Sequence, residues 1–304
     1  MDHRPARTQK RRKAEADILK LRRISRMSSQ IDRILAETRR SLERRKAAVP
    51  ATALEAAAAA HAPRGFARGL RLRAASAPAV IAELKKASPS RGLIRQRFDV
   101  AELASGLAAG GAAALSVLTE EAFFQGSLKN LETASRVSGL PCLRKDFLLD
   151  EYQVLEARAH GADAVLLIAA ALDDARLRQL VREAHACELD VLCEVHTGEE
   201  LERVLGLGCD AVGVNNRNLK TFEVRLEVSL DLAERLPEGA VRVAESGIET
   251  AEDIERLRRA GFHAFLVGES LMRQPDPGRA LFSLLRPAAG EKPAPAVGMA
   301  GTGR

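Results

Sequence analysis

Residues 164–205 read AVLLIAAALDDARLRQLVREAHACELDVLCEVHTGEELERVL, which is two successive units of a short apolar run followed by an amphipathic stretch. Residues 164–168 and 191–195 are apolar and rich in branched side chains, as strands buried on both faces are. Residues 174–187 and 199–205 repeat apolar side chains at helical spacing. Because strands that alternate with helices build parallel sheets, this segment predicts an α/β fold.

The same alternation continues on both sides of this segment. Strands are predicted at residues 79–84, 113–118, 141–144, 211–214, 241–244 and 264–267, and helices at residues 100–109, 127–137, 151–159, 228–236, 251–260 and 279–285. Eight strand–helix units in succession predict a (β/α)8 TIM barrel. The alternative is a doubly wound sheet, which usually carries a G-x-G-x-x-G or G-x-x-x-x-G-K turn after its first strand. This chain has neither motif there, so the barrel is favoured.

The composition is typical of a globular protein that works in water. Of the 304 residues, 46% are hydrophobic and 29% are charged, and a chain of this length can bury a large core. No apolar run approaches the roughly 20 residues that span a bilayer, and the N-terminus lacks the apolar core of a signal peptide. We therefore expect a cytoplasmic protein with no membrane partner.

Basic residues are concentrated at the N-terminus. Residues 1–46 contain 16 Lys and Arg against 6 Asp and Glu, which gives this segment a charge of +10. Because the whole chain carries +6, the remainder carries −4. The basic character therefore says little about the partners of the main domain.

The two ends of the chain are expected to differ from its middle. Residues 1–26 are predicted to be a disordered basic extension, and residues 287–304, which are rich in Pro, Gly and Ala, a disordered tail. Residues 28–46 place apolar side chains at helical spacing and are predicted to be a helix, whereas the Ala-rich residues 51–60 fit either a helix or a linker. The catalytic domain, including that N-terminal helical segment, is expected to span residues 27–286.

The cysteines and histidines form no metal or redox motif. Cys142, Cys187, Cys193 and Cys209 include no C-x-x-C pair, and the six histidines lack the spacing of metal ligands. We expect reduced thiols in the core, no metal and no cofactor.

Polar side chains follow seven of the eight predicted strands. The endings are Glu83-Leu84-Lys85, Thr119-Glu120-Glu121 with Phe123-Phe124, Arg144-Lys145-Asp146-Phe147, Glu194-Val195-His196, Asn215-Asn216-Arg217-Asn218, Glu245-Ser246-Gly247 and Gly268-Glu269-Ser270. In a (β/α)8 barrel the carboxyl ends of the strands meet at one rim, where the reactive groups lie. The recurrence therefore predicts a site at that rim instead of isolated surface charges.

The last two endings indicate a phosphate site. Ser246-Gly247 and Gly268-Glu269 follow strands seven and eight, after which such barrels commonly bind phosphate. Glycine lets the backbone approach an anion closely, and backbone N–H groups favour negative charge. The alternative is that Ser246 and Thr250 only cap the next helix.

The remaining polar side chains indicate acid–base chemistry. Lys85 and Lys145 are grouped with Glu83, Glu194 and Glu245, and with Asn215. A lysine that faces carboxylates keeps its proton and can act as a general acid, while a carboxylate in that setting can accept a proton. The rival mechanism is a Schiff base formed by Lys145, which would need that lysine to lose its proton.

Seven segments together resemble the indole-3-glycerol-phosphate synthase family of tryptophan biosynthesis. They are IAELKKASPSRG (81–92), LTEEAFFQGS (118–127), LRKDFLLDEYQVLEARAHGADAVLLI (143–168), CEVHTGEEL (193–201), VGVNNRNLKTFEV (212–224), VAESGI (243–248) and LVGESLMR (266–273). The resemblance covers roughly residues 28–286 and implies a barrel with an N-terminal helical extension near the active-site mouth. It also implies a carbon–carbon lyase that closes the ring of 1-(2-carboxyphenylamino)-1-deoxyribulose 5-phosphate, giving indole-3-glycerol phosphate, carbon dioxide and water.

The resemblance implies roles for individual residues. Lys145 matches the general acid that protonates the substrate carbonyl, and Glu194 matches the carboxylate of the later proton transfer and dehydration. Glu83 and Lys85 match a pair in which Lys85 holds the substrate carboxylate and is a second proton donor; which lysine acts at which step is left open. Asn215 and Glu245 match residues that orient the substrate hydroxyls and the catalytic lysine. The phosphate site is matched by Ser88, Ser246, Gly247, Gly268 and the N–H of Glu269. Phe124 and Phe147 match the pocket for the anthranilate ring, with Phe123 as a competitor of Phe124.

Other functions fit less well. Phosphoribosylanthranilate isomerase, another phosphate-binding barrel, typically uses a Cys/Asp pair, whereas the first strand here ends in Glu83 and Lys85. A nucleic-acid-binding protein would need a basic face on the folded domain and stacking aromatics, but the main domain is net acidic and aromatics make up 3% of the chain. We expect a monomer that acts on a phosphorylated small molecule, with at most weak association with other enzymes of the pathway. His196 is assigned no role, and Tyr152 is interpreted as packing.

Overall fold

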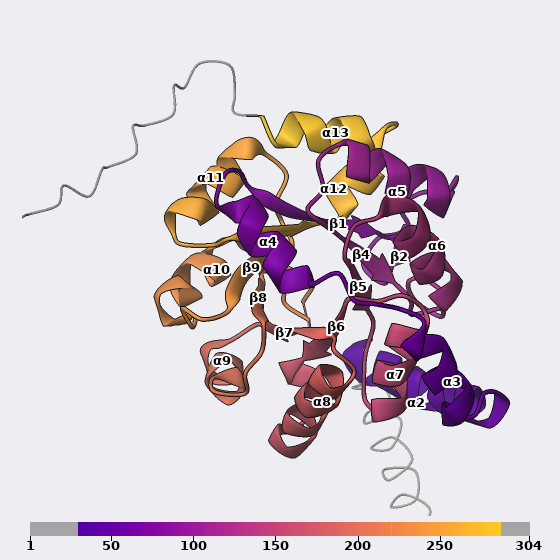
Figure 1. Ribbon diagram of the computed structural model, residues 1–304. Helices are drawn as coiled ribbons and strands as arrows, with labels where there is room; N and C mark the ends of the chain where they lie inside the picture. Colours follow the sequence, from indigo (N-terminus) through magenta and orange to yellow (C-terminus); the bar gives the residue numbers. More distant parts are fainter. Residues whose placement is uncertain (1–29, 220, 287–304) are drawn as a thin grey trace, which may run out of the picture.

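Eight parallel strands close into a barrel in a computed structural model that describes residues 30–219 and 221–286 (Figure 1). The order around the barrel is β1-β10-β9-β8-β7-β6-β5-β4. The predicted (β/α)8 TIM barrel with an N-terminal helix is therefore confirmed, and the doubly wound alternative is wrong. The predicted basic extension at residues 1–26 and the predicted tail at residues 287–304 lie outside the described residues. No helix in the described part of the chain is long and apolar enough to cross a membrane.

Each barrel strand agrees with a predicted strand to within one residue at either end. The strands are β1 (Ala79–Leu84), β4 (Ala114–Leu118), β5 (Cys142–Lys145), β6 (Ala164–Ile168), β7 (Asp190–Val195), β8 (Ala211–Asn215), β9 (Val241–Glu245) and β10 (Ala264–Val267). The short strands β2 (Ala87–Ser88) and β3 (Gly92–Leu93) form an antiparallel hairpin in the loop after β1.

Helices follow the barrel strands and also precede the first one. They are α2 (Gln30–Ala48), α3 (Ala51–Ala59), α4 (Phe66–Ala74), α5 (Val100–Ala109), α6 (Leu128–Ser138), α7 (Glu151–Ala159), α8 (Asp174–Ala186), α9 (Gly198–Val204), α10 (Glu227–Leu232), α11 (Ala251–Arg259), α12 (Glu269–Met272) and α13 (Pro277–Leu284), with 3-10 turns η1 (Ala169–Ala171) and η2 (Ala233–Arg235). The helical reading of residues 51–60 is confirmed by α3. The helix predicted at residues 228–236 is divided between α10 and η2.

Alternation along each strand separates two layers of the core. In β1, Val80 and Ala82 pack with the surrounding helices, whereas Ile81 packs with apolar side chains of other strands inside the barrel. Glu83 follows Ile81 by two residues, so it points to the same interior side, one level nearer the carboxyl rim. The same parity places polar side chains above an apolar floor in β5, β7, β8 and β9.

Helix α4 closes the amino-terminal end of the barrel. Phe66 and Leu70 are fully buried and belong to the interior cluster with Ala79 and Ala114, which stand at the starts of their strands. Figure 1 shows α4 lying across this end of the barrel. The sequence pattern did not predict this helix. Its position means that the polar rim lies at the opposite end.

The N-terminal helix α2 is anchored against α7. Leu42 and Tyr152 share a small buried cluster with Leu54 of α3, and the Tyr152 hydroxyl donates to the Val49 carbonyl at 3.0 Å. Arg45 Nε donates to Glu156 Oε1 at 2.8 Å. Tyr152 therefore packs as predicted and also holds the end of α2. This anchoring carries the first turn of α2 to the carboxyl rim of the barrel.

Candidate active site

A cavity of about 260 Å³ opens at the carboxyl ends of the barrel strands, beneath the first turn of α2. Gln30, Ile31 and Ile34 of α2 line one side of it. All the residues that the sequence predicted for the site line this cavity, namely Glu83, Lys85, Ser88, Phe124, Lys145, Phe147, Glu194, Asn215, Glu245, Ser246, Gly247, Gly268 and Glu269. The loops thus bring together side chains from opposite sides of the barrel.

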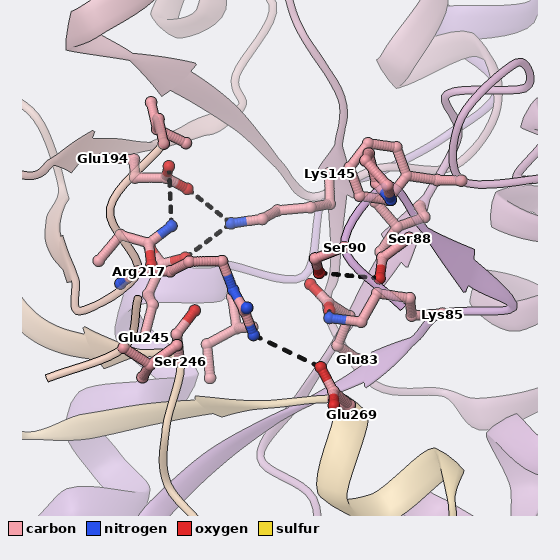
Figure 2. A pocket seen from close by; sticks show the side chains of 18 of the residues that line it. Glu83, Lys85, Ser88, Ser90, Lys145, Glu194, Arg217, Glu245, Ser246 and Glu269 are labelled. Atoms are coloured by element: carbon pink, nitrogen blue, oxygen red, sulfur yellow. Dashed lines mark hydrogen bonds and ion pairs between the residues drawn. The ribbon is translucent and has the colours of Figure 1, made fainter. Parts of the chain in front are cut away.

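Lys145 lies at the centre of the charged side chains (Figure 2). Its Nζ is 2.8 Å from Glu194 Oε2 and 2.6 Å from Glu245 Oε2. Burial alone would lower the pKa of Lys145, but the carboxylates of Glu194, Glu245 and Glu83 raise it above its ordinary value. Lys145 is therefore held as an ammonium group by its carboxylate neighbours.

The two glutamates that hold Lys145 differ in their pKa. Burial raises the pKa of Glu245 to about 7, in part offset by the Lys145 ammonium. Burial acts on Glu194 in the same direction, but Lys145 and His196 outweigh it and hold the pKa of Glu194 well below its usual range. Two carboxyl groups with separated pKa values can divide proton acceptance and proton donation between them.

Asn215 fixes the other oxygen of Glu194. Its Nδ2 donates to Glu194 Oε1 at 3.1 Å, while its own Oδ1 accepts from the Arg217 backbone N–H at 3.0 Å. The second bond decides which end of the amide faces Glu194. Asn215 therefore presents a donor to the carboxylate from the end of β8.

Glu83 and Lys85 form the predicted pair at the end of β1. Lys85 Nζ lies 2.5 Å from Glu83 Oε1, and Ser116 Oγ donates to Glu83 Oε2 at 3.4 Å. Gly268 of the neighbouring strand end leaves room for this carboxylate, since a Cβ there would come within 2.5 Å of Glu83 Oε1. Glycine at this position thus serves Glu83 as well as the predicted phosphate site.

The turn after β9 is conformationally strained. Ser246 has a φ of 67° and Gly247 a φ of 77°, so two successive residues adopt the left-handed conformation. Such a conformation is costly for a residue other than glycine and is concentrated at functional sites. Thr250, not Ser246, caps α11 by accepting from the Asp253 N–H, so the helix-cap alternative holds for Thr250 alone. Ser246 lines the cavity instead.

Two arginines beside this corner were not assigned by the sequence analysis. Arg91 Nε lies 3.0 Å from Glu269 Oε1, and Arg217 Nη2 lies 3.4 Å from Glu269 Oε2. Both line the cavity, and Figure 2 shows Arg217 directed toward Glu269. Arg91 lies in the quoted SPSRG segment and Arg217 in NNRN, so both were visible in motifs that the sequence analysis used for other residues.

The apolar part of the cavity contains two phenylalanine rings. The ring centroids of Phe124 and Phe147 are 6.4 Å apart, with an angle of 41° between the planes. Phe123 does not line the cavity, and its backbone N–H donates to Glu120 Oε2 at 2.7 Å. Of the two neighbouring residues, Phe124 is therefore the one that lines the cavity.

Some polar residues at the strand ends point away from the cavity. Glu120 accepts from the backbone N–H groups of its own loop, so the ending of β4 contributes no carboxylate to the site. Arg144 is buried outside the barrel, 3.0 Å from Asp146 Oδ2 and 2.9 Å from Glu156 Oε2. The end of β4 thus contributes Leu118 and Phe124 to the cavity, but none of the polar residues Thr119, Glu120 and Glu121.

His196 stands directly behind the site, although the sequence analysis gave it no role. Its Nε2 lies 3.2 Å from Glu194 Oε1, and its Nδ1 lies 3.0 Å from Glu200 Oε2. It does not line the cavity. The spacing of His196 and Glu200 by four residues at the start of α9 was the available signal.

The described residues that line the cavity include no cysteine, whereas phosphoribosylanthranilate isomerase typically uses a Cys/Asp pair. The four cysteines all lie in the described part of the chain, are free, and do not line the cavity. Among residues 30–219 and 221–286, no three His, Cys, Asp or Glu side chains are grouped as metal ligands.

Fold and site together define a TIM-barrel protein whose reactive groups stand on the loops after its strands. Comparison with known families identifies the family within this fold: the one described as indole-3-glycerol phosphate synthase matches residues 31–284. The chain belongs to the indole-3-glycerol phosphate synthase family.

Curated relatives agree over almost their whole length. An indole-3-glycerol phosphate synthase of Koribacter versatilis is 59% identical over 259 residues, covering 85% of this chain and all of the relative. One of Burkholderia multivorans is 48% identical over 256 residues, covering 84% of this chain and 98% of the relative.

Solved structures with much lower identity share the fold. An N-acetylmannosamine-6-phosphate 2-epimerase from Clostridium perfringens matches with a TM-score of 0.54 at 15% identity, over 69% of this chain and 92% of its own. A thiamine phosphate pyrophosphorylase from Pyrococcus furiosus matches with a TM-score of 0.51 at 18% identity, over 68% of this chain and 93% of its own. At such identities the likeness concerns the barrel fold alone.

Proposed function

We propose that this protein converts 1-(2-carboxyphenylamino)-1-deoxy-D-ribulose 5-phosphate into indole-3-glycerol phosphate, carbon dioxide and water. Membership of the family and the names of the curated relatives support the activity. The observation that carries the mechanism is the position of Lys145, a partly buried ammonium held between two carboxylates at the mouth of the barrel.

Ring closure needs an acid at the substrate ketone. As the aromatic carbon that bears the carboxylate attacks the ketone carbon, the carbonyl oxygen becomes a hydroxyl and takes up one proton. Lys145 supplies that proton, since its pKa lies above the ordinary value and its carboxylate neighbours stabilise the ammonium until the substrate arrives. Carbon dioxide then leaves, and the electron pair of the broken bond restores the aromatic ring.

Dehydration needs an acid and a base. The new hydroxyl departs as water after gaining a proton, and a proton leaves the neighbouring carbon or nitrogen to form the indole double bond. Glu194 is the proton acceptor of this step, because Lys145, Asn215 and His196 keep it ionised and fixed. Lys85, paired with Glu83, holds the substrate carboxylate and is the second proton donor.

The remaining residues bind the substrate. Phe124 and Phe147 hold the anthranilate ring beneath α2, and Glu245 together with Asn215 orients the sugar hydroxyls and Lys145. The phosphate lies at the corner formed by Ser88, Ser246, Gly247, Gly268 and the N–H of Glu269. Positive φ values at Ser246 and Gly247 support this placement, because they expose backbone N–H groups to an anion.

The test is direct. Purified protein is incubated with the synthetic carboxyphenylamino ribulose phosphate, and the fluorescent indole product is followed while mass spectrometry records the loss of carbon dioxide and water. A parallel incubation contains phosphoribosylanthranilate. Product formation from the first compound supports the proposal; conversion of the second alone would replace it with the isomerase. The cytoplasmic location, the monomeric state and the freedom from metals and cofactors remain predictions.

A further inference from the structure

One largely enclosed histidine, His196, connects the proposed proton acceptor to a neighbouring helix. The His196 side chain is 9% exposed and lies between two carboxylates, with Nε2 3.2 Å from Glu194 Oε1 and Nδ1 3.0 Å from Glu200 Oε2. The His196 backbone N–H donates to the same Glu200 oxygen at 2.7 Å. Glu200 therefore holds both the backbone and the ring of His196.

We propose that His196 is a positioning residue that holds the Glu194 carboxylate in place and ionised from behind the cavity. This inference rests on the proposed function, since it assigns His196 its role through Glu194. It goes beyond that function because it adds a residue that touches no part of the substrate.

Glu194 is contacted by two residues that line the cavity and by His196, which does not. Its Oε2 accepts from Lys145 at 2.8 Å, and its Oε1 accepts from Asn215 at 3.1 Å. His196 Nε2 lies 3.2 Å from the same Oε1, as an ion pair without the geometry of a hydrogen bond. The interaction is thus one of charge, and it requires a protonated imidazole.

The residues around His196 stabilise the protonated imidazole. The charged groups that face its ring are Glu194 from β7 and Glu200 from α9, with Lys145 of β5 on the far side of Glu194. Burial alone would lower the pKa of His196, but its contacts with the two glutamates raise it to about 10. His196 is therefore a cation throughout the neutral range.

A second cation becomes important once the reaction begins. When Lys145 gives its proton to the substrate, Glu194 loses one of its two positive neighbours. His196 remains protonated and keeps a positive charge beside the carboxylate. Glu194 then stays ionised, ready to accept the proton of the later step, instead of becoming protonated in a buried site.

Three substitutions in the full chain test this role. His196→Gln removes the charge and keeps a side-chain amide, and Glu200→Gln weakens the hold on His196 without touching Glu194. His160→Gln is the matched control, since His160 Nδ1 pairs with Glu132 Oε1 at 2.7 Å outside the cavity. For each protein, kcat, KM and the pH dependence of kcat are measured with the carboxyphenylamino ribulose phosphate.

The expected results separate positioning from mere stability. His196→Gln should lower kcat by about 10- to 100-fold and change KM by less than about twofold, as the loss of a supporting residue does. The acidic limb of its kcat profile should move to higher pH, because Glu194 is protonated more easily. Glu200→Gln should lower kcat above neutral pH, where His196 then loses its proton, and His160→Gln should match the wild type.

Failure of this inference can be distinguished from failure of the proposed function. If the wild type turns over and His196→Gln keeps its kcat and pH profile, the inference is wrong and the function stands. If the wild type does not convert the substrate, the proposed function is wrong. NMR titration of the histidine rings then tests separately whether His196 is charged. A His196 ring that titrates near its ordinary pKa of about 6.5 overturns the inference, whereas one that stays charged above pH 9 supports it. The same titration decides the matter if His196→Gln does not fold.

Discussion

Lys145 and Glu245 are 100 residues apart in the chain, yet Lys145 Nζ lies 2.6 Å from Glu245 Oε2. Their strands, β5 and β9, are four places apart in a barrel of eight, so the lysine reaches across the barrel mouth to the opposite wall. Glu194 of β7 meets the same Nζ from a position between them. Closure of the barrel thus brings side chains from the ends of three strands into contact, where they can exchange protons.

The protonated state of Lys145 predicts that the reaction does not pass through an imine. Sodium cyanoborohydride, added during turnover, should leave both activity and protein mass unchanged, because an ammonium has no free electron pair for attack on the ketone. Intact-protein mass spectrometry checks this. A mass gain that corresponds to one reduced substrate adduct on Lys145 would restore the Schiff-base mechanism.

Gly213 is predicted to be necessary for the position of Glu245. A Cβ on Gly213 would overlap Glu245 Oε1, so Gly213→Ala should push this carboxylate off Lys145 and lower kcat by about tenfold or more. Gly106→Ala is the control, because no atom lies within 4 Å of a Cβ at that helical position. Steady-state kinetics compare the two variants. Equal kcat values in both would show that Glu245 does not depend on the space at Gly213.

Glu156 is predicted to connect α2 with the strand that carries Lys145. It pairs with Arg45 at 2.8 Å and with the buried Arg144 at 2.9 Å. Glu156→Gln leaves a buried cation with fewer partners, so the free energy of unfolding should fall by about 3 kcal/mol in urea titrations. Glu37→Gln, which breaks surface pairs with Arg40 and Arg44, should leave the free energy of unfolding almost unchanged. Similar losses in both variants would contradict this role.

His196 is predicted to make stability depend on pH. Its pKa is raised from 6.5 to about 10 in the folded protein, so its charge stabilises the fold fully below pH 6.5. That contribution is lost as the pH rises from 6.5 toward 10. Wild type should therefore exceed His196→Gln in unfolding free energy by on the order of 5 kcal/mol near pH 6, and the gap should close toward pH 10. A gap that is constant over this range would show that the ring is not charged by its neighbours.

The sequence predicted the barrel well because its signals are local. Runs such as residues 164–168 are short, apolar and followed by amphipathic helices, and the observed strand matches those bounds. Helix α4 was missed because it carries Gly69 and three arginines, and only Phe66, Ala67 and Leu70 are buried. Its apolar face is defined by the barrel end that it covers, which no local pattern contains.

The site was predicted as a set of residues but not as a set of contacts. Parity along β1, β7 and β9 places Glu83, Glu194 and Glu245 on the interior side, so their convergence follows from the fold. Which carboxylates meet Lys145 depends on strand order around the closed barrel. The role of Gly213 and that of His196 depend on neighbours from other elements, and therefore became visible only in three dimensions.

The most direct test of Lys145 as the general acid is the rate of indole-3-glycerol phosphate formation by Lys145→Ala. This rate is measured by fluorescence beside the wild type and Lys129→Ala. Lys129 is an exposed lysine that pairs with Glu132 on α6, so its loss should not affect the rate. Circular dichroism confirms that each variant is folded. We expect product from the wild type and the control, and a fall in kcat of about 1,000-fold or more for Lys145→Ala. A folded Lys145→Ala protein that forms product at close to the wild-type rate would contradict this role.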